Sequence, residues 1–181
     1  MEKIIQIDKQ LMVFLNNLGS PEMDDFWQLI TKQFSWTPLF ILLAFLLYKA
    51  YGWKKLVIIL LTVAVMLTIV DQSTNLIKEF FKRIRPCNDD EIKHLIRVVK
   101  QSDSYSYFSG HASNSMANMM FVFLLLRKHF KFAYLLFLFP LIFGFSRIYL
   151  GMHFPFDILS GYVYGAIWGF LFYRVVKRIK V

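Results

Sequence analysis

The chain has 181 residues, of which 57% are hydrophobic and 18% are charged, against roughly 25% charged in ordinary soluble proteins. This composition excludes a disordered chain and a coiled coil, and the lone Cys87 excludes an internal disulfide framework or a CxxC metal site. The formal net charge is nevertheless +9. Lipid is therefore the expected solvent, and the few charges must be concentrated in particular parts of the chain.

Residues 1–34 form an amphipathic region ahead of the long apolar stretches. Ile5, Leu11, Phe14 and Leu15 fall at helical spacing and would form the apolar face of a helix lying in the membrane interface. A helix packed on the bundle fits the same pattern. A cleavable signal peptide is not expected, because a basic start followed by an apolar core of the usual length is missing.

Five apolar stretches follow, each close to the ~20 residues that a bilayer crossing needs. They cover residues 34–53, 56–77, 108–126, 132–150 and 154–173. The predicted fold class is all-α: a polytopic transmembrane helix bundle of about five spans with an N-terminal amphipathic helix at the interface. A sixth span would arise if residues 1–34 entered the membrane. The predicted domains are the amphipathic region, 1–34, and a transmembrane domain, 35–181, with a polar loop at 79–107.

The charges divide unevenly between the two ends of these stretches. The end with residues 1–34 and the polar loop carries 11 basic residues and all 12 acidic ones, whereas the opposite end carries ten basic residues and no acid. By the positive-inside rule the second end is cytoplasmic, so we expect a multi-pass protein of the cell (inner) membrane with its polar loop facing the periplasm or exterior. A nucleic-acid partner is not expected, because the basic excess is juxtamembrane.

Cations gather at the outward ends of the predicted spans. Lys78, Arg85 and Arg147 have few acidic neighbours in the sequence, and the arginine fork matches phosphate oxygens. Ser109 and Gly110 stand at a predicted helix start, where a hydroxyl and free backbone N–H groups form an anion site. The sequence therefore predicts phosphate binding at this end.

Two histidines and an aspartate at the same end suit proton transfer or nucleophilic attack. His111 follows Gly110, and His153 precedes Asp157 by four residues. If Pro155 opens the last helix, the Asp157 carboxylate can reach the His153 imidazole and fix its tautomer, as the aspartate of a catalytic triad does. Together with the cations, these groups predict phosphoryl transfer from a lipid headgroup.

Two other patterns have a structural explanation. Asp71 and Asn75 are placed to form hydrogen bonds between helices. Gly161, Gly165 and Gly169, at four-residue steps, favour close helix packing, and a dimer face is the alternative.

Three motifs in the chain resemble those of the type 2 phosphatidic acid phosphatase (PAP2) superfamily of membrane lipid phosphatases. They are Lys78 followed after six residues by Arg85-Pro86, then Phe108-Ser109-Gly110-His111, then Ser146-Arg147 with His153 and Asp157. The resemblance implies that His153 is the nucleophile, that Asp157 orients it and that His111 protonates the leaving oxygen. It implies phosphate binding by Lys78, Arg85, Ser109, Gly110 and Arg147, without a metal or other cofactor. Phe108 departs from the family, which usually has proline there.

The expected function is hydrolysis of a lipid phosphate or diphosphate on the outer leaflet through a phosphohistidine. The outward site and the short chain favour undecaprenyl diphosphate, whereas lipid A 1-phosphate, phosphatidylglycerol phosphate and phosphatidic acid stay open. So do a phosphotransferase with an acceptor other than water, and a non-catalytic anionic-lipid binder or transporter. The expected partner is a membrane lipid phosphate, and the sequence leaves the oligomeric state open.

Overall fold

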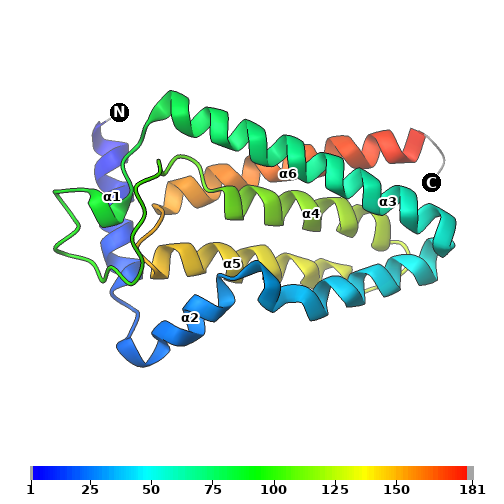
Figure 1. Ribbon diagram of the computed structural model, residues 1–181, viewed down its shortest axis with the longest axis horizontal. Coiled ribbons are helices and arrows are strands. Elements are labelled where there is room, and N and C mark those ends of the chain that lie inside the picture. The colour runs from blue at the N-terminus through cyan, green and yellow to red at the C-terminus, as the bar shows by residue number, and fades with distance from the viewer. Residues whose placement is uncertain (1, 179–181) are drawn as a thin grey trace.

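The structure, a computed structural model, describes residues 2–178 and is all-α, as predicted. Four 3₁₀ helices, η1 (Pro21–Met23), η2 (Gln33–Trp36), η3 (Pro86–Asn88) and η4 (Ala133–Phe137), separate the α-helices of this range. The long helices lie side by side along the long axis, with α1 and the polar loop at one end (Figure 1). The six α-helices are α1 (Glu2–Asn16), α2 (Asp24–Ile30), α3 (Thr37–Phe81), α4 (Gly110–Leu126), α5 (Leu138–Tyr149) and α6 (Pro155–Arg178).

Helix α3 consists of two arms that meet at Gly52. Gly52 has φ 76° and ψ 170°, a conformation that only glycine adopts readily, and the arms run antiparallel on either side of it (Figure 1). The predicted stretches 34–53 and 56–77 are these two arms, and the other three correspond to α4, to η4 with α5, and to α6. Among residues 2–178, the helical stretch Gln33–Asn88 is the one long and apolar enough to cross a membrane by these criteria, while Ala133–Tyr149 is a shorter apolar helix.

The outer surface of α3 is apolar. Leu61 and Leu76 are 63% and 73% exposed, and Val65 and Ile69 are exposed between them. An apolar surface of this extent is rare on a soluble monomer. It fits the lipid-facing side of a membrane helix.

Helix α6 packs against α4 through three glycines, as the sequence predicted. A Cβ atom on Gly165 would lie 2.2 Å from the Ser113 carbonyl oxygen of α4. Cβ atoms on Gly161 and Gly169 would lie 2.9 and 2.5 Å from the Ser109 and Ala117 carbonyl oxygens. Small residues therefore let the two backbones touch.

Adding a single methyl group at this interface tests the packing. We expect Gly165→Ala to destabilise the protein by about 1–3 kcal/mol, because the methyl must push α6 away from α4. Thermal unfolding in detergent measures the change. Val163→Ile adds one methylene on the same helix, at a side chain that is 64% exposed, and should unfold like the wild type. Equal stability of the two variants would contradict the close packing.

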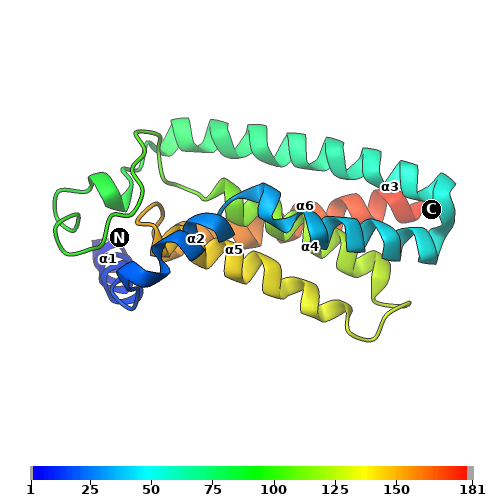
Figure 2. The same cartoon turned by 60° about the horizontal axis from the view of Figure 1, so that its bottom comes forward.

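Helix α1 lies across the end of the bundle, in both views (Figures 1 and 2). Its buried face is formed by Asp8, Met12 and Asn16. The Asn16 Nδ2 donates to the carbonyl oxygens of Ile148 and Tyr149 at 3.0 and 2.8 Å, which ties α1 to the end of α5.

The apolar face that the sequence predicted for α1 is largely exposed. Ile5, Leu11 and Phe14 are 44%, 38% and 62% exposed, whereas Leu15 packs inward on the bundle. The helix therefore packs on the bundle with one face and leaves apolar side chains uncovered on another. This transverse position fits an interfacial helix better than a sixth span.

Candidate active site

Three chain segments bring the predicted site residues to one end of the bundle. Lys82, with φ 47°, ends α3 in the left-handed conformation, and the chain continues outside any helix to Arg85, whose backbone is extended. Ser109 caps α4, its Oγ accepting from the Ala112 N–H at 3.4 Å. Helix α6 begins at Pro155, two residues after His153.

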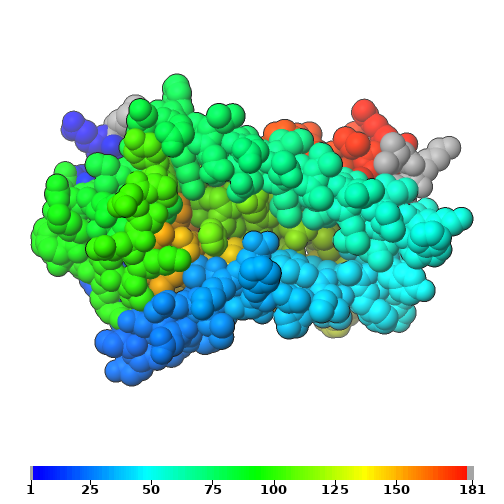
Figure 3. All heavy atoms as spheres, in the orientation of Figure 1, coloured from blue at the N-terminus to red at the C-terminus, as the bar shows by residue number. Residues whose placement is uncertain are grey.

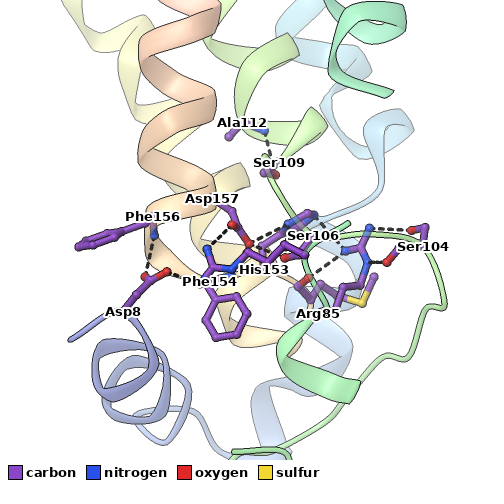
Figure 4. A network of polar contacts seen from close by, with 12 residues as sticks. Asp8, Arg85, Ser104, Ser106, Ser109, Ala112, His153, Phe154, Phe156 and Asp157 are labelled. Atoms are coloured by element: carbon purple, nitrogen blue, oxygen red, sulfur yellow. Dashed lines mark hydrogen bonds and ion pairs between the residues drawn. The ribbon is translucent and has the colours of Figure 1, made fainter. Parts of the chain in front are cut away.

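His153 and Asp157 are in contact, as their spacing predicted. His153 Nδ1 lies 3.5 Å from Asp157 Oδ2, and both side chains are buried. The Ser106 hydroxyl lies against both groups: it donates to Asp157 Oδ2 and lies 3.4 Å from His153 Nδ1. Figure 4 shows the three residues together, with Asp157 on α6 and Ser106 on the polar loop.

Arg85 occupies the other side of the imidazole. Its Nη1 lies 3.0 Å from His153 Nε2 and also donates to the Met152 carbonyl oxygen at 2.8 Å. A guanidinium can only donate, so Nε2 must be an acceptor and the ring proton must be on Nδ1, facing Asp157. Ser104 holds Arg85 through its carbonyl and hydroxyl oxygens at 2.7 and 2.8 Å (Figure 4).

The environment of His153 favours its neutral form. Burial lowers the pKa of His153 well below its usual value, and the positive charges of Arg85, Arg147 and Lys78 lower it further. In the neutral imidazole Nε2 carries no proton and lies beside an anion-binding guanidinium, and it becomes free to attack once Arg85 turns its hydrogen bond to a bound anion.

Besides Ser106, two residues that the sequence did not mark as site residues complete the site. Arg83 donates to Asp157 Oδ1 and to Asp8 Oδ2, both at 2.7 Å, and its guanidinium lies 4.0 Å from the centre of the Phe154 ring. Asp8, on α1, also accepts from the Phe156 N–H at 2.9 Å (Figure 4). Burial raises the pKa of Asp8, and the hydrogen bond from Arg83 opposes that shift.

The sequence contains an indication that Arg83 faces the site. In an extended segment residues i and i+2 point to the same side, and Ile84, between Arg83 and Arg85, is 58% exposed. Arg83 therefore faces the site whenever Arg85 does. Asp8 and Ser106 carry no comparable signal, because their positions depend on how α1 and the polar loop fold back on the bundle.

A cavity of about 620 Å³ lies between α3, α4 and α5. His153 does not line it, but the lining residue Lys78 is close enough to lower the pKa of His153. Lys78, Gly110 and His111 line it, and the His111 ring stacks on Phe143 with 4.9 Å between centroids. Asp71 and Asn75, which share a helix face with Lys78, line it as well. The structure thus brings Lys78, Gly110 and His111 to one cavity wall.

Ser109 and Arg147 are buried and do not line the cavity. Ser109 is fully buried and caps α4. Arg147 is 5% exposed and donates from Nη1 to Thr31 Oγ1 at 2.7 Å, while its Nε has no hydrogen-bond partner among the described residues. Phe108 is also buried, and its ring packs on Tyr164 with 4.8 Å between the centroids. Helix α4 begins at Gly110 although Phe108 replaces the proline of the motif that the sequence resembles.

An apolar groove continues from the cavity between the two arms of α3. It measures about 230 Å³ and shares Gln33, Phe40, Leu67 and Asn118 with the cavity lining. Figure 3 shows the hollow between the arms, with α4 at its floor. A polar site that opens laterally into an apolar groove suits a lipid whose headgroup is charged and whose chains are not.

Two solved structures share this fold. The fold matches the crystal structure of a transmembrane PAP2-type phosphatidylglycerolphosphate phosphatase from Bacillus subtilis with a TM-score of 0.74 and 20% identity, over 99% of this chain and 89% of that one. It also matches Aquifex aeolicus LpxE with a TM-score of 0.66 and 22% identity, over 91% and 93%.

The sequence is similar to curated proteins over nearly its whole length. It is 29% identical to the lipid A 4'-phosphatase of Bacteroides thetaiotaomicron, over 98% of this chain and 80% of that protein. An undecaprenyl-diphosphatase, BcrC of Bacillus subtilis, is 32% identical over only 46% of this chain and 42% of that protein. The PAP2 superfamily model matches residues 51–180. The chain therefore belongs to the PAP2 superfamily and is a metal-independent lipid phosphate phosphatase of the membrane type.

Proposed function

We propose that the protein hydrolyses a lipid phosphate through a phosphohistidine formed on His153. The observation that carries this proposal is the position of His153 between Arg85, at Nε2, and Asp157, at Nδ1, which favours an unprotonated Nε2 beside a phosphate-binding guanidinium. In the first step Nε2 attacks phosphorus, the bond from phosphorus to the lipid oxygen breaks, and His111 donates a proton to that oxygen. Water then attacks phosphorus, His111 takes its proton, and His153 leaves as a neutral imidazole.

The cations hold the phosphate during both steps. Lys78 and the backbone N–H groups at Gly110 reach it from the cavity wall, and Arg85 reaches it from beside His153. Arg147 contributes its charge from a buried position, and Ser109 keeps the start of α4 in place as its cap. Such fixed positive groups stabilise the charge that develops on the phosphoryl oxygens.

Arg83 and Asp8 act on the reaction through Asp157. Arg83 joins the two carboxylates, and Asp8 is carried by α1. We assign both as positioning residues: they fix the Asp157 carboxylate, which in turn fixes the His153 ring. In this way α1 becomes part of the catalytic framework although it lies outside the bundle.

The preferred substrate is a lipid A-type phosphate. Undecaprenyl diphosphate, which the sequence alone favoured, has weaker support, because similarity to a named undecaprenyl-diphosphatase covers less than half of the chain. Similarity to two lipid A 4'-phosphatases, those of Bacteroides thetaiotaomicron and Porphyromonas gingivalis, covers 98% and 97% of it.

A substrate panel tests this proposal. Protein purified in detergent, without divalent metal, is given lipid A, undecaprenyl diphosphate, phosphatidylglycerol phosphate and phosphatidic acid, and phosphate release is measured for each. We expect the highest kcat/KM on lipid A. A higher kcat/KM on undecaprenyl diphosphate would identify that lipid as the better substrate. No phosphate release from any of the lipids would contradict the proposed function.

The proposed membrane arrangement has five spans and an outward-facing site. Residues 1–34 stay at the interface, residues 35–181 form the spanning domain, and the loop 79–107 is extracytoplasmic. The charge asymmetry of the sequence supports this orientation. A cysteine placed at exposed His94 should be labelled by an impermeant reagent added from outside, in a Cys87→Ser background. Labelling from the cytoplasmic side alone would contradict both the orientation and outer-leaflet substrates.

A further inference from the structure

One wall of the cavity carries a cluster of hydrogen-bond acceptors that the proposed reaction does not use. Asp71 Oδ1 accepts from Asn114 Nδ2 at 3.1 Å, across the α3–α4 interface, and Asp71 Oδ2 accepts from Asn75 Nδ2 at 3.4 Å. All three side chains line the cavity. We call Asp71, Asn75 and Asn114 the acceptor cluster.

The acceptor cluster has unused capacity. Asn114 Oδ1 is buried and has no hydrogen-bond partner among the described residues. Turning the amide over would place an oxygen against the Asp71 carboxylate, so the observed orientation is the one that the neighbouring charge requires. The bond from Asn75 is long, and a carboxylate oxygen accepts more than one hydrogen bond. Asp71 Oδ2 is thus available to a ligand in the cavity, whereas Asn114 Oδ1 is enclosed by protein atoms.

The cluster lies deeper than the phosphate site. Asp71 precedes Lys78 by seven residues on the same helix face, a separation of about 10 Å along the axis. A phosphate held by Lys78 therefore leaves the cluster to the group that the phosphate is attached to. The cavity of about 620 Å³ has room for that group, since pockets of roughly 300–1,000 Å³ hold whole small ligands.

The two walls of the cavity differ in chemistry. The acceptor cluster forms one wall, and Phe139 and Phe143 of α5 line the cavity as well. A ring with hydroxyl or amide N–H donors on its edge can donate hydrogen bonds to the acceptor cluster. The C–H groups on its faces can pack against Phe139 and Phe143. A second phosphate does not suit this cavity, because the Asp71 carboxylate would repel it.

We infer that Asp71, held in place by Asn114, is a specificity-determining residue that binds a hydroxyl or amide N–H donor of a phosphorylated sugar headgroup. This inference rests on the proposed function, since it names what the same site recognises beyond the phosphate. The hydrogen bond between Asp71 and Asn114 also joins two helices, as the sequence suggested for Asp71, but it uses only Oδ1 of the carboxylate and leaves Oδ2 with one long bond at the cavity.

Binding of soluble headgroup analogues tests the inference without turnover. Full-length protein in detergent, without divalent metal, is titrated with a hexosamine phosphate, glycerol phosphate and inorganic phosphate, and Kd is obtained from thermal shift. We expect the wild type to bind the hexosamine phosphate about tenfold more tightly than inorganic phosphate, since a few hydrogen bonds are added. Asp71→Asn and Asn114→Leu should lose this preference and keep the affinity for inorganic phosphate.

Thr62→Val is the matched control. Thr62 is on α3 outside the cavity and bonds only to the Ile58 carbonyl oxygen, so the preference should persist. A wild type without preference would overturn the inference, and so would variants that lose affinity for all three ligands equally. If neither variant folds, the wild-type preference decides. A protein that prefers the hexosamine phosphate but releases no phosphate from any lipid would contradict the proposed function and leave this inference standing.

Discussion

Replacement of His153 by glutamine is expected to reduce phosphate release from a lipid phosphate by at least about 10⁴-fold, because the attacking nitrogen is lost. Glutamine keeps a polar side chain of similar reach, so Arg85 and Asp157 retain a hydrogen-bonding neighbour. Phosphate release in detergent, without added metal, measures the loss. An alkaline quench of the wild type during turnover should trap phosphate on the protein in a base-stable form that later acid treatment releases, as expected of a phosphohistidine.

His94→Gln is the matched control for this experiment. His94 is an exposed histidine of the polar loop, and its replacement should leave the rate unchanged. Trapped phosphate should be present in His94→Gln and missing from His153→Gln. Turnover by His153→Gln at the wild-type rate would rule out the covalent mechanism.

Replacement of Arg83 by glutamine is expected to destabilise the protein by about 3–5 kcal/mol, because it leaves two buried carboxylates without their counter-charge. Asp8 and Asp157 are 1% and 0% exposed, so water cannot replace the lost guanidinium. The activity of the molecules that remain folded should also fall, in kcat more than in KM, since Asp157 orients the nucleophile and does not bind substrate. Denaturation in detergent and steady-state kinetics measure the two effects.

The second carboxylate provides the internal check. Asp8→Asn should lower the free energy of unfolding less than Arg83→Gln does, because Arg83 then keeps Asp157 as its partner. The double variant should be more stable than the sum of the single losses predicts, since the two residues interact directly. Arg83→Lys should recover only part of the stability, because one ammonium cannot match the fork that joins both carboxylates. Strictly additive losses would contradict the bridging role of Arg83.

The sequence predicted the helices well because the bilayer imposes a length and a composition on each of them. The two arms of α3, the start of α4 at Gly110 and the start of α6 at Pro155 all follow from apolar stretches bounded by polar or helix-breaking residues. The contact between His153 and Asp157 was also predictable, because a four-residue spacing at a helix start leaves little freedom.

Contacts between distant segments were not predictable in the same way. Asp8 and Arg83 are 75 residues apart in the sequence, and Asp71 and Asn114 are 43 apart. The residues around each of them do not indicate which distant residue they contact. The interfacial helix shows the same limit: its apolar residues predicted a membrane-facing surface, whereas its buried Asp8 and Asn16 depend on the bundle that they dock against.

The sequence by itself determined the all-α class, the convergence of the motif residues at one end and the chemistry of phosphate binding, because local periodicity and residue type carry that information. Only the tertiary structure decided which groups surround the nucleophile. A buried carboxylate is stable only with its partners in place, and those partners come from the N-terminal helix and the polar loop, which the folded bundle brings together.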